Sequence, residues 1–470
     1  MNKYLLIFLS IVVMLSGCSL APSYTRPEAP LPAAWPSGPA YSEQQAASNA
    51  LPPGETPWQE FFTDKRLQQV IKTALVNNRD LRLATLNVQR AQAIYGIKRW
   101  ELFPALAASA NGNRQRIPAD LSTTGKQYTA EQYDINLGVF AWEIDFFGRL
   151  QNLKDQALES FLATEQARRS TQILIVSAVA DTYLTLAADQ DSLALAQTTF
   201  ESQKQAYNLI KERYNDGLAS EIDLNRAQTQ VEIARRDMAL YTQQVAQDIN
   251  ALNLLVGTQP PLARATFPQG LKGVTPLKIQ APGISSRVLL DRPDILQAEN
   301  LLKAAHANIG AARASLFPRV SLTSTVGTAS SELSGLFKSG SGTWLFAPQV
   351  TLPIFDGRLW SALDISKVDR EIALVQYEKA IETAFREVAD TLAVLGTVDQ
   401  RLTAQQSLVD TAAETYQLAD VRYTNGIDDY LSVLDAHRSL YAAQQELVVI
   451  HLAKLTSEVR LYAALGGGTK

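Results

Sequence analysis

The chain has 470 residues, of which 46% are hydrophobic and 19% are charged, and its formal net charge is -4. This slightly acidic balance offers no basic surface for nucleic acid. A mean hydropathy of -0.07 excludes a polytopic helical membrane protein. No window beyond the N-terminus offers the roughly 20 uncharged apolar residues that a spanning helix requires.

The first residues, MNKYLLIFLSIVVMLSGCSL, are typical of a signal peptide, which we place at residues 1–17. Lys3 precedes an apolar run that is too short for a comfortable membrane span. The run ends in Leu-Ser-Gly-Cys, which resembles the lipobox of bacterial lipoproteins, and Cys18 is the single cysteine of the sequence. We therefore expect Cys18 to be acylated, and this covalent lipid is the only cofactor expected. Disulfides cannot contribute to stability.

Residues 18–63 are predicted to form an acylated N-terminal tether, which begins with the proline-rich stretch APSYTRPEAPLPAAWPSGPA. Proline resists helix and sheet, so the tether should be extended. Regular structure is predicted from about Asp64, as a helix over roughly 64–101. This helix should end before the Leu-Phe-Pro at 102–104, because the residue before a proline is pushed towards extended geometry.

Two strands around a polar loop and then a very long helix are predicted next. In this first pair of strands, apolar residues alternate with Asp134, Asn136 and Gly138, which is the period of a strand; they are Tyr133, Ile135, Leu137, Val139 and Ala141. After Gly148, whose lack of a side chain allows a sharp change of direction, a helix is predicted that continues to about Tyr214. Its length would be roughly 100 Å. Its apolar positions step by 3, 4, 3 and 4: Ile173, Val176, Ala180, Tyr183 and Ala187. Such stepping predicts side-by-side packing with other helices.

The chain contains two copies of one unit. YNLIKERYNDGLASEIDLNRA at 207–227 aligns without gaps on YQLADVRYTNGIDDYLSVLDA at 416–436, and the Leu-Phe-Pro at 102–104 recurs at 316–318. We predict two helix-strand-strand-helix-helix repeats, with the short helices of each stacked end to end against its long one. The repeats are residues 64–257 and 286–466, with a linker at 258–285 and a C-terminal tail at 467–470.

The predicted strands indicate an oligomer. Two hairpins supply four strands with apolar alternation but no second sheet to bury it. A closed barrel needs about eight or more strands, and closure removes the edges in lipid. Three chains would supply twelve strands and surround one axis with long helices.

Several motifs in a fixed order resemble the outer membrane factors of tripartite efflux pumps, which are TolC-like proteins, and especially the OprM-like lipoprotein channels. They are the lipobox, the two Leu-Phe-Pro junctions, the FGRL and DGRL helix starts, the paired RYxxG turns and the C-terminal LTSEVRLYAALGGG. The resemblance covers essentially the whole mature chain. It implies a mostly α protein with a membrane β-barrel part. A trimeric twelve-stranded barrel would be continued by a twelve-helix periplasmic α-barrel, with an equatorial belt at the linker.

The resemblance also implies location and function. The protein would be a lipid-anchored protein of the bacterial outer membrane with a long periplasmic extension. It would passively conduct drugs or other small toxic compounds to the exterior. Its partners would be two further copies in a homotrimer, a periplasmic adaptor (membrane fusion) protein, an inner-membrane RND transporter and outer-membrane lipid, with no nucleic acid.

The same resemblance implies a gate at the periplasmic helix tips that opens like an iris. Leu431 and Asp435 lie one helical turn apart, on the face that looks down the threefold axis in this family. Three copies of Leu431 would form a hydrophobic constriction, and three copies of Asp435 an anionic ring that attracts cations. Arg226 occupies the matching position of the first repeat, which excludes a uniform ring of six acids.

Arg422 and Tyr423 match the family residues that latch the inner helix pair to its neighbours. The alternative for each residue is an ordinary surface contact worth under about 1 kcal/mol. Cooperation of three equivalent copies favours the latch.

The two turns at the helix tips are the predicted adaptor contacts. Gly217 and Gly426 would let the helices reverse as left-handed C-terminal caps. The contact residues predicted there are Arg213, Tyr214, Gly217, Leu218, Gly426 and Ile427.

An enzyme is the first alternative class. The sequence has no P-loop, HExxH or CxxC, and its three histidines, at 306, 437 and 451, lie at non-ligand spacing. Glu143 and Asp145 share strand parity, as paired acid and base carboxylates would, but a solvated lumen or strand end explains them better. No enzymatic activity is therefore predicted.

Two further alternatives remain open. One is an exit duct for polypeptides in type I secretion. The other is a structural periplasmic coiled-coil lipoprotein, which would have no use for the four alternating strands.

Overall fold

The computed structural model describes residues 19–32, 34–41, 56–259, 261–274 and 285–467. The predicted signal peptide, Cys18 and part of the predicted linker lie outside these residues. The chain divides into two units. Unit 1 consists of Met1–Glu28, Asn87–Glu165 and Gln297–Tyr377, and unit 2 consists of Ala29–Leu86, Gln166–Leu296 and Glu378–Lys470.

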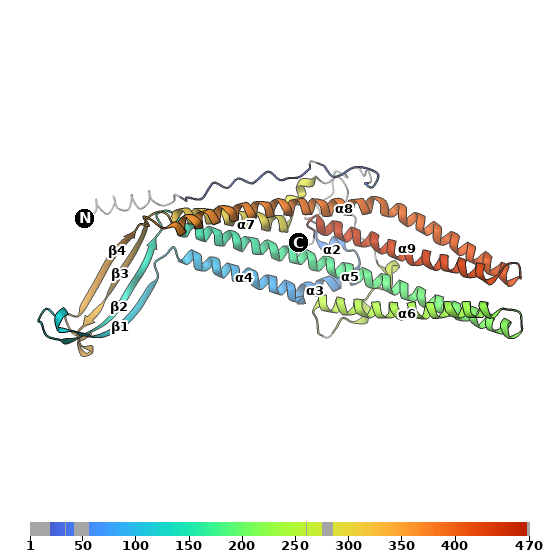
Figure 1. Cartoon of the computed structure of the whole chain (residues 1–470), viewed down its shortest axis with the longest axis horizontal. Helices are drawn as coiled ribbons and strands as arrows, with labels where there is room; N and C mark the ends of the chain where they lie inside the picture. Colours follow the sequence, from blue (N-terminus) through green and yellow to red (C-terminus); the bar gives the residue numbers. More distant parts are fainter. Residues whose placement is uncertain (1–18, 33, 42–55, 260, 275–284, 468–470) are drawn as a thin grey trace. The chain divides into compact units, whose positions relative to one another are not determined.

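Unit 1 contains one antiparallel sheet with the strand order β1-β2-β3-β4 (Figure 1). The strands are β1 (Leu106–Ile117), β2 (Tyr128–Ile144), β3 (Arg319–Ser330) and β4 (Gly342–Thr351). Two hairpins, β1-β2 and β3-β4, are joined by pairing of β2 with β3. Within the described residues, the outer edges of β1 and β4 pair with no further strand, so the sheet is open.

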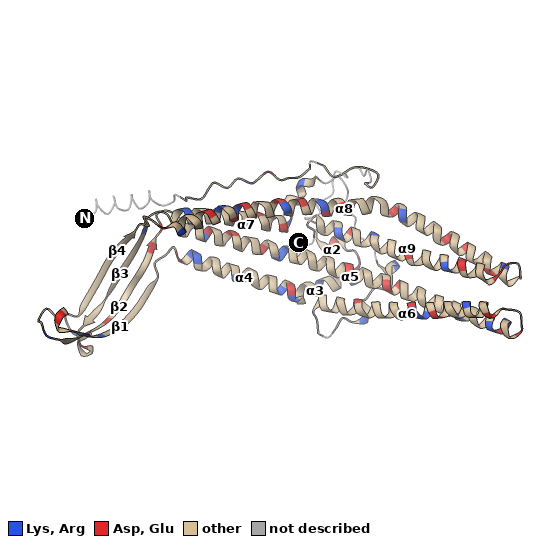
Figure 2. Cartoon of the chain, viewed as in Figure 1, with Lys and Arg blue, Asp and Glu red and all other residues tan. Residues whose placement is uncertain are grey.

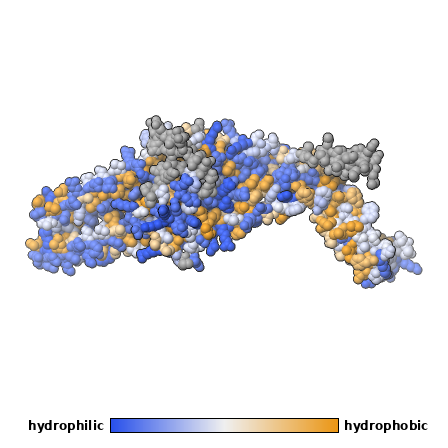
Figure 3. Space-filling view, turned by 180° about the vertical axis from the view of Figure 1, so that it is seen from behind, coloured by the Kyte–Doolittle hydropathy of each residue, from blue (hydrophilic) through white to orange (hydrophobic). Residues whose placement is uncertain are grey.

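One face of this sheet is apolar and the other is polar. Leu137 lies opposite Ala108 on one side and Val326 on the other, and Val326 lies opposite Trp344. The larger side chains of this row are exposed, with Trp344 at 77%. Hydrophobic surface covers much of the sheet in the space-filling view (Figure 3).

The opposite face carries polar side chains that bond to one another. Asp134 accepts hydrogen bonds from Asn111 across the strands, at 3.1 Å, and from Asn136 along its own strand, at 2.7 Å. Charged residues are few along the middle of the strands, and β4 contains none (Figure 2).

A bulge interrupts the pairing of β2 with β3 near the base of the sheet, between Val139 and Trp142. Ala141 adopts a left-handed conformation there, with φ of 54°, and its backbone N–H donates to the Thr323 hydroxyl at 3.0 Å. Bulges bend a strand and increase its twist, so this one curves the sheet where it meets the helices.

The two carboxylates considered as an acid and base pair have structural partners in unit 1. Glu143, at the end of β2, accepts two hydrogen bonds from the Arg149 guanidinium, at 2.8 and 2.7 Å, and also pairs with Arg319. Asp145 accepts from the backbone N–H of Gln151 at 2.7 Å, in the first turn of α5. The interpretation of these carboxylates as strand-end residues therefore agrees with their geometry.

Helices form most of the described chain. The α-helices are α2 (Trp58–Phe61), α3 (Lys65–Asn77), α4 (Arg79–Trp100), α5 (Arg149–Asn215), α6 (Glu221–Val256), α7 (Pro293–Ala314), α8 (Gly357–Thr424) and α9 (Tyr430–Ala464). Short 3-10 helices are η2 (Ala119–Leu121), η3 (Arg264–Thr266), η4 (Leu271–Gly273), η5 (Ser286–Asp291) and η6 (Leu333–Gly335). The long helix predicted from the glycine at 148 is α5, with 67 residues.

The helix predicted over 64–101 is divided at Asn78. Asn78 is extended, with ψ of 134°, and it ends α3. Its side-chain oxygen accepts from the backbone N–H groups of Asp80 and Leu81, at 2.8 and 3.0 Å, and so caps α4. The sequence shows no proline or glycine at this point, so the break depends on a side chain that serves both helices.

Two helix junctions in unit 2 have side chains that bond across them. Asn78 donates to the Leu255 carbonyl of α6 at 2.7 Å. Arg292, directly before α7, donates to the Ala464 carbonyl of α9 at 2.6 Å. In each case the donor satisfies a carbonyl left without an intrahelical partner at a helix C-terminus. Short helices thus meet end to end at both places.

The main core of unit 2 packs α2 and α3 against the middle of α5 and the end of α9. Phe61 stacks on Tyr462 with ring centroids 4.1 Å apart, and Tyr183 is fully buried beside them. The predicted heptad positions Val176 and Ala180 belong to this core.

One described helix, α5, is long and apolar enough to cross a membrane by length and composition, and 56% of its most apolar window is buried. Burial of that window in the core accounts for its apolar residues.

Candidate functional site

The candidate site lies in unit 2, where the α5-α6 hairpin and the α8-α9 hairpin each reverse direction (Figure 1). Gly217 and Gly426 have φ of +72° and +73°, the left-handed conformation that side chains disfavour. The backbone N–H of Leu218 donates to the Arg213 carbonyl at 2.7 Å, and that of Ile427 donates to the Arg422 carbonyl at 2.9 Å. Both turns are therefore Schellman caps.

The helices that leave the turns are capped by side chains. Ser220 accepts from the backbone N–H of Asp223 at 3.1 Å to begin α6. Asp429 accepts from the backbone N–H of Ser432 at 3.2 Å to begin α9. These caps hold the two turns in one conformation and expose Leu218 and Ile427, which are 70% and 63% accessible.

Arg422 is engaged within its own turn. Its guanidinium donates two hydrogen bonds to Asp428, at 2.6 and 2.9 Å. The Arg422 hydrogen bond lowers the pKa of Asp428 below its ordinary value, and the same contact raises the pKa of Arg422. The pair is open to solvent.

Tyr423 joins the two hairpins. The Arg213 guanidinium carbon, from α5, lies 4.9 Å from the centre of the Tyr423 ring, within cation-π range. The Tyr423 ring also contacts the Tyr430 ring of α9, and the centres of the two rings are 5.3 Å apart. Burial raises the pKa of both tyrosines, so both remain neutral at physiological pH.

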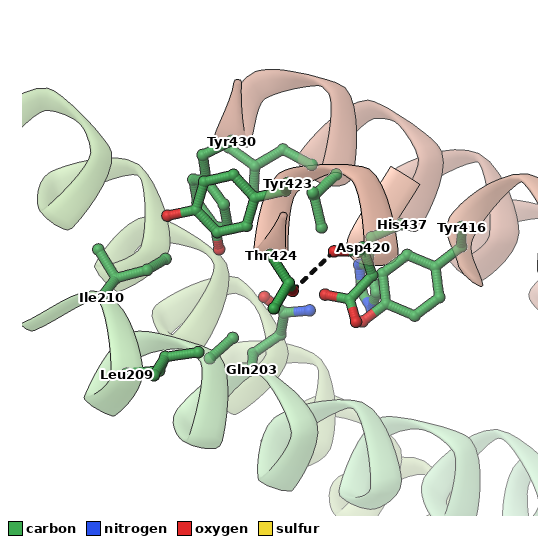
Figure 4. A pocket seen from close by; sticks show the side chains of 12 residues that line it. Gln203, Leu209, Ile210, Tyr416, Asp420, Tyr423, Thr424, Tyr430 and His437 are labelled. Carbon is green, nitrogen blue, oxygen red and sulfur yellow. Dashed lines mark hydrogen bonds between the residues drawn. The ribbon is translucent and has the colours of Figure 1, made fainter. Parts of the chain in front are cut away.

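A small apolar cluster lies behind these rings. Its buried members are Ile210, Ala227, Ala419, Tyr430, Val433, Leu434 and Ala436. A narrow pocket beside it separates α5 from α8 and α9, and Figure 4 shows Gln203, Leu209 and Ile210 facing Tyr416, Tyr423 and His437 across it. Burial lowers the pKa of His437, which therefore packs as a neutral ring.

Leu431 and Asp435 lie on the exposed side of α9. Leu431 is 38% accessible, and the Asp435 side chain is 65% accessible. Asp435 has a long ion pair with Arg438 of the same helix, at 3.7 Å. Of the predicted residues, the structure thus brings Arg213 and Tyr423 together and leaves Leu431 partly and Asp435 largely accessible to solvent. Tyr214 is half-exposed on α5.

Further from the turns, α6 and α9 are linked by side chains that no motif of the sequence indicates: Asp237, Tyr241, Tyr441 and Gln445. Tyr441 donates to Asp237 and Gln445 donates to Tyr241. Heptad stepping indicates that such helices pack together, but it does not show which polar side chains meet.

Residues 19–28 belong to unit 1 and bond to its helices. The Ser19 hydroxyl donates to Asn152 at 2.9 Å, and the Leu20 carbonyl accepts from Arg313 at 3.2 Å. Further along, Arg26 forms an ion pair with the buried Glu299 at 2.9 Å. The segment that follows Cys18 is thus held beside the first turn of α5.

The chain matches the family model "Outer membrane efflux protein" over residues 70–258 and 284–467. It is 49% identical to the toluene efflux pump outer membrane protein TtgC of Pseudomonas putida, covering 100% of this chain and 96% of that protein. It is 40% identical to the outer membrane protein OprJ of Pseudomonas aeruginosa, covering 98% and 95%. The crystal structure of the open state of the MtrE outer membrane channel of Neisseria gonorrhoeae superposes with a TM-score of 0.85 at 34% identity, covering 96% and 99%.

The chain therefore belongs to the outer membrane efflux protein family, and the resemblance seen in its motifs is confirmed. It is an outer-membrane protein that serves as an exit channel of an efflux system. The family is one of transport proteins rather than enzymes.

Proposed function

We propose that three copies of the chain assemble into a passive duct, closed at rest at the helix tips, that conducts small toxic compounds across the outer membrane. In this assembly three four-stranded sheets make a twelve-stranded barrel. The long helices of the three chains enclose a periplasmic tunnel below it.

The observation that carries this proposal is the open sheet of unit 1. Its strands have 10 to 17 residues, and about 9–11 suffice for a strand to cross a bilayer. One face is an exposed apolar row and the other is polar, as a barrel wall between lipid and water requires. Four strands leave two unpaired edges, and unpaired backbone groups cannot remain in lipid. Neighbouring copies of the same sheet satisfy both edges.

An internal duplication accounts for the helical part. The family model matches two successive stretches of the chain, and the tips at Gly217 and Gly426 share one cap geometry. Each repeat contributes one long helix and short helices that meet end to end. Three chains would then surround the axis with twelve helical positions.

Acylation of Cys18 would fix the chain to the membrane. Ser19, the next residue, is bonded to Asn152. Asn152 lies one turn after Arg149, which binds Glu143 at the end of β2. The anchor would therefore be held close to the base of the sheet, where the bilayer surface should lie.

The partners proposed are a periplasmic adaptor and an inner-membrane transporter of the RND class. The exposed turns at Leu218 and Ile427 are the proposed adaptor contacts, since capped, rigid tips with apolar side chains suit a protein partner. A related protein is named for toluene efflux, which favours small organic compounds over polypeptides as cargo.

The gate is proposed at Leu431 and Asp435. Their own chain leaves both side chains accessible, so in a threefold assembly they are free to face the axis. Three leucines would narrow the lumen, and three carboxylates would favour cations.

Negative-stain imaging of the detergent-extracted protein tests this function. The expected result is a threefold particle with a lumen that narrows at the helix tips and gives a small ion conductance in planar bilayers. A compact monomer without a lumen would overturn the proposal.

A further inference from the structure

Helices α6 and α9 are joined by two side-chain hydrogen bonds one helical turn apart. The Tyr441 hydroxyl donates to Asp237 at 3.3 Å, and the Gln445 amide donates to the Tyr241 hydroxyl at 3.1 Å. Both pairs are separated by 204 residues, so the two helices run parallel in fixed register. We call these four residues the brace.

Asp237 is the buried charged residue of the brace. It is 7% exposed, and its second oxygen accepts two hydrogen bonds from Arg236, at 2.9 and 2.6 Å. Both carboxylate oxygens are therefore bonded, and withdrawal of Tyr441 would leave part of a buried charge without its partner. Removing one partner from a buried charge is costly, because water does not replace it.

The polar contacts at the helix tip are weaker by the same criterion. Arg422 and Asp428 are open to solvent, and such pairs contribute little because water competes for both groups. Arg213 also meets Tyr423 through a cation-π contact near the surface. When the hairpins separate, the tip contacts should break before the brace does.

The brace lies beyond the proposed gate along α9. Tyr441 and Gln445 follow Leu431 by ten and fourteen residues, which corresponds to roughly 15–20 Å of helix. The helix is thus tied to α6 at one point, with the gate residues on the free segment between this point and the turn at Gly426.

We propose that the brace is the fulcrum of gate opening: α6 and α9 stay joined at Asp237 and Tyr441 while the segments between the brace and the turns move apart. Tyr441 and Gln445 are then positioning residues, which act on the lumen through Leu431 and Asp435. This inference depends on the proposed function of the tip as a gate.

Conductance of the full-length protein in planar bilayers tests the fulcrum. Tyr441→Phe removes one hydroxyl and keeps the ring, and it should raise the basal conductance at least twofold because the gate segment is no longer held in register. Gln445→Leu should act in the same direction. Gln406→Leu is the matched control, since Gln406 is exposed and bonds only to Asp410 of its own helix, and it should leave conductance unchanged.

Chemical bridging separates a fulcrum from a moving contact. Cysteines at 237 and 441, joined by a short bis-maleimide, restore a link between α6 and α9 and should let the channel open as often as the unmodified protein does. Cysteines at 213 and 423, joined in the same way, should reduce opening at least fivefold. Equal loss of opening with both bridges would show that the brace also separates, and the inference would be wrong.

The double variant Leu431→Ala with Asp435→Ala distinguishes failure of the fulcrum from failure of the gate. If this variant conducts more than the unmodified channel while Tyr441→Phe does not, the gate stands and the fulcrum is refuted. If neither the unmodified protein nor any variant conducts, the proposed function fails and the fulcrum fails with it.

Discussion

Three acidic residues close together at the α8-α9 turn have different surroundings. Asp428 is bonded to Arg422, and Asp429 caps α9 through Ser432. Asp435 has a long contact with Arg438, and its side chain is 65% accessible. Two of the three carboxylates are therefore explained by the local structure of the turn, and Asp435 is the one available for a role in the proposed gate.

Replacement of Leu431 and Asp435 by alanine should widen the resting lumen. The double variant removes three leucine side chains and three carboxylates from one level of the proposed trimer. We expect a higher single-channel conductance in planar bilayers and a weaker preference for cations. Unchanged conductance in a folded, trimeric double variant would remove these residues from the gate.

Gly426→Ala should loosen the tip without any steric clash. A Cβ at this position meets no atom within 4 Å, so the cost comes from the left-handed backbone alone, about 1 kcal/mol. Hydrogen exchange at the amides of the turn should then be about fivefold faster. Gly357→Ala is the control, because Gly357 also has open space around it but lies at the start of α8 without a left-handed φ.

At the scale of the elements, the helices of unit 2 bury several carboxyl groups at their interfaces. Burial raises the pKa of Asp181 to about 6 and that of Glu458 to about 7. The pKa of Asp248 is raised to about 7, first by burial and then by Asp189 beside it. These acids retain their protons in the folded helices at pH values where the unfolded chain has lost them.

The consequence is a helical bundle that is more stable in acid. As the pH rises from about 4.5 to about 7, the unfolded chain releases the Glu458 proton and the folded chain keeps it, so the free energy of unfolding falls. Above that range the contribution is constant. The unmodified protein should therefore unfold at a higher temperature at pH 5 than at pH 8.

Glu458→Gln should remove part of this pH dependence. Glu458 is 6% exposed, and its neutral replacement no longer has to ionise in the core. We expect a gain of roughly 1–3 kcal/mol at pH 8 and little change at pH 4. Thermal unfolding followed by circular dichroism at both pH values measures the difference. A loss of stability at pH 8 would show that the ionised carboxylate has a favourable partner in the assembled protein.

At the scale of the whole molecule, the lipid and the strands of the proposed trimer would have separable functions. Closure of the barrel would depend on the pairing of the edges of β1 and β4 with neighbouring copies. A lipid on Cys18 would add attachment to the membrane, which the inserted barrel would also provide.

Cys18→Ala should therefore abolish acylation without abolishing the trimer. Labelling with palmitate in cells should be lost, while size-exclusion chromatography in detergent should still give the trimer. Ser19→Ala is the control, since it removes the hydrogen bond to Asn152 and keeps the cysteine. Labelling that persists in Cys18→Ala would refute the lipid site.

Local patterns in the sequence were sufficient to predict most elements. Gly217 and Gly426 specify left-handed caps because of their missing side chains, and the alternation from Tyr133 to Val139 specifies a strand that has two different faces. Ala141, which the alternation also included, lies instead in the bulge of β2. These features depend on neighbouring residues along the chain. For that reason they can be recognised in the sequence alone, and together they indicate the family.

The contacts between distant segments could be decided only by the tertiary structure. Asn78 divides one predicted helix because its side chain reaches the end of α6, and Asp237 meets Tyr441 because two helices pack in one register out of several. Packing of apolar side chains is compatible with each of these registers, since apolar contacts are not directional. Hydrogen bonds are directional, and they form only where packing has already placed donor and acceptor together.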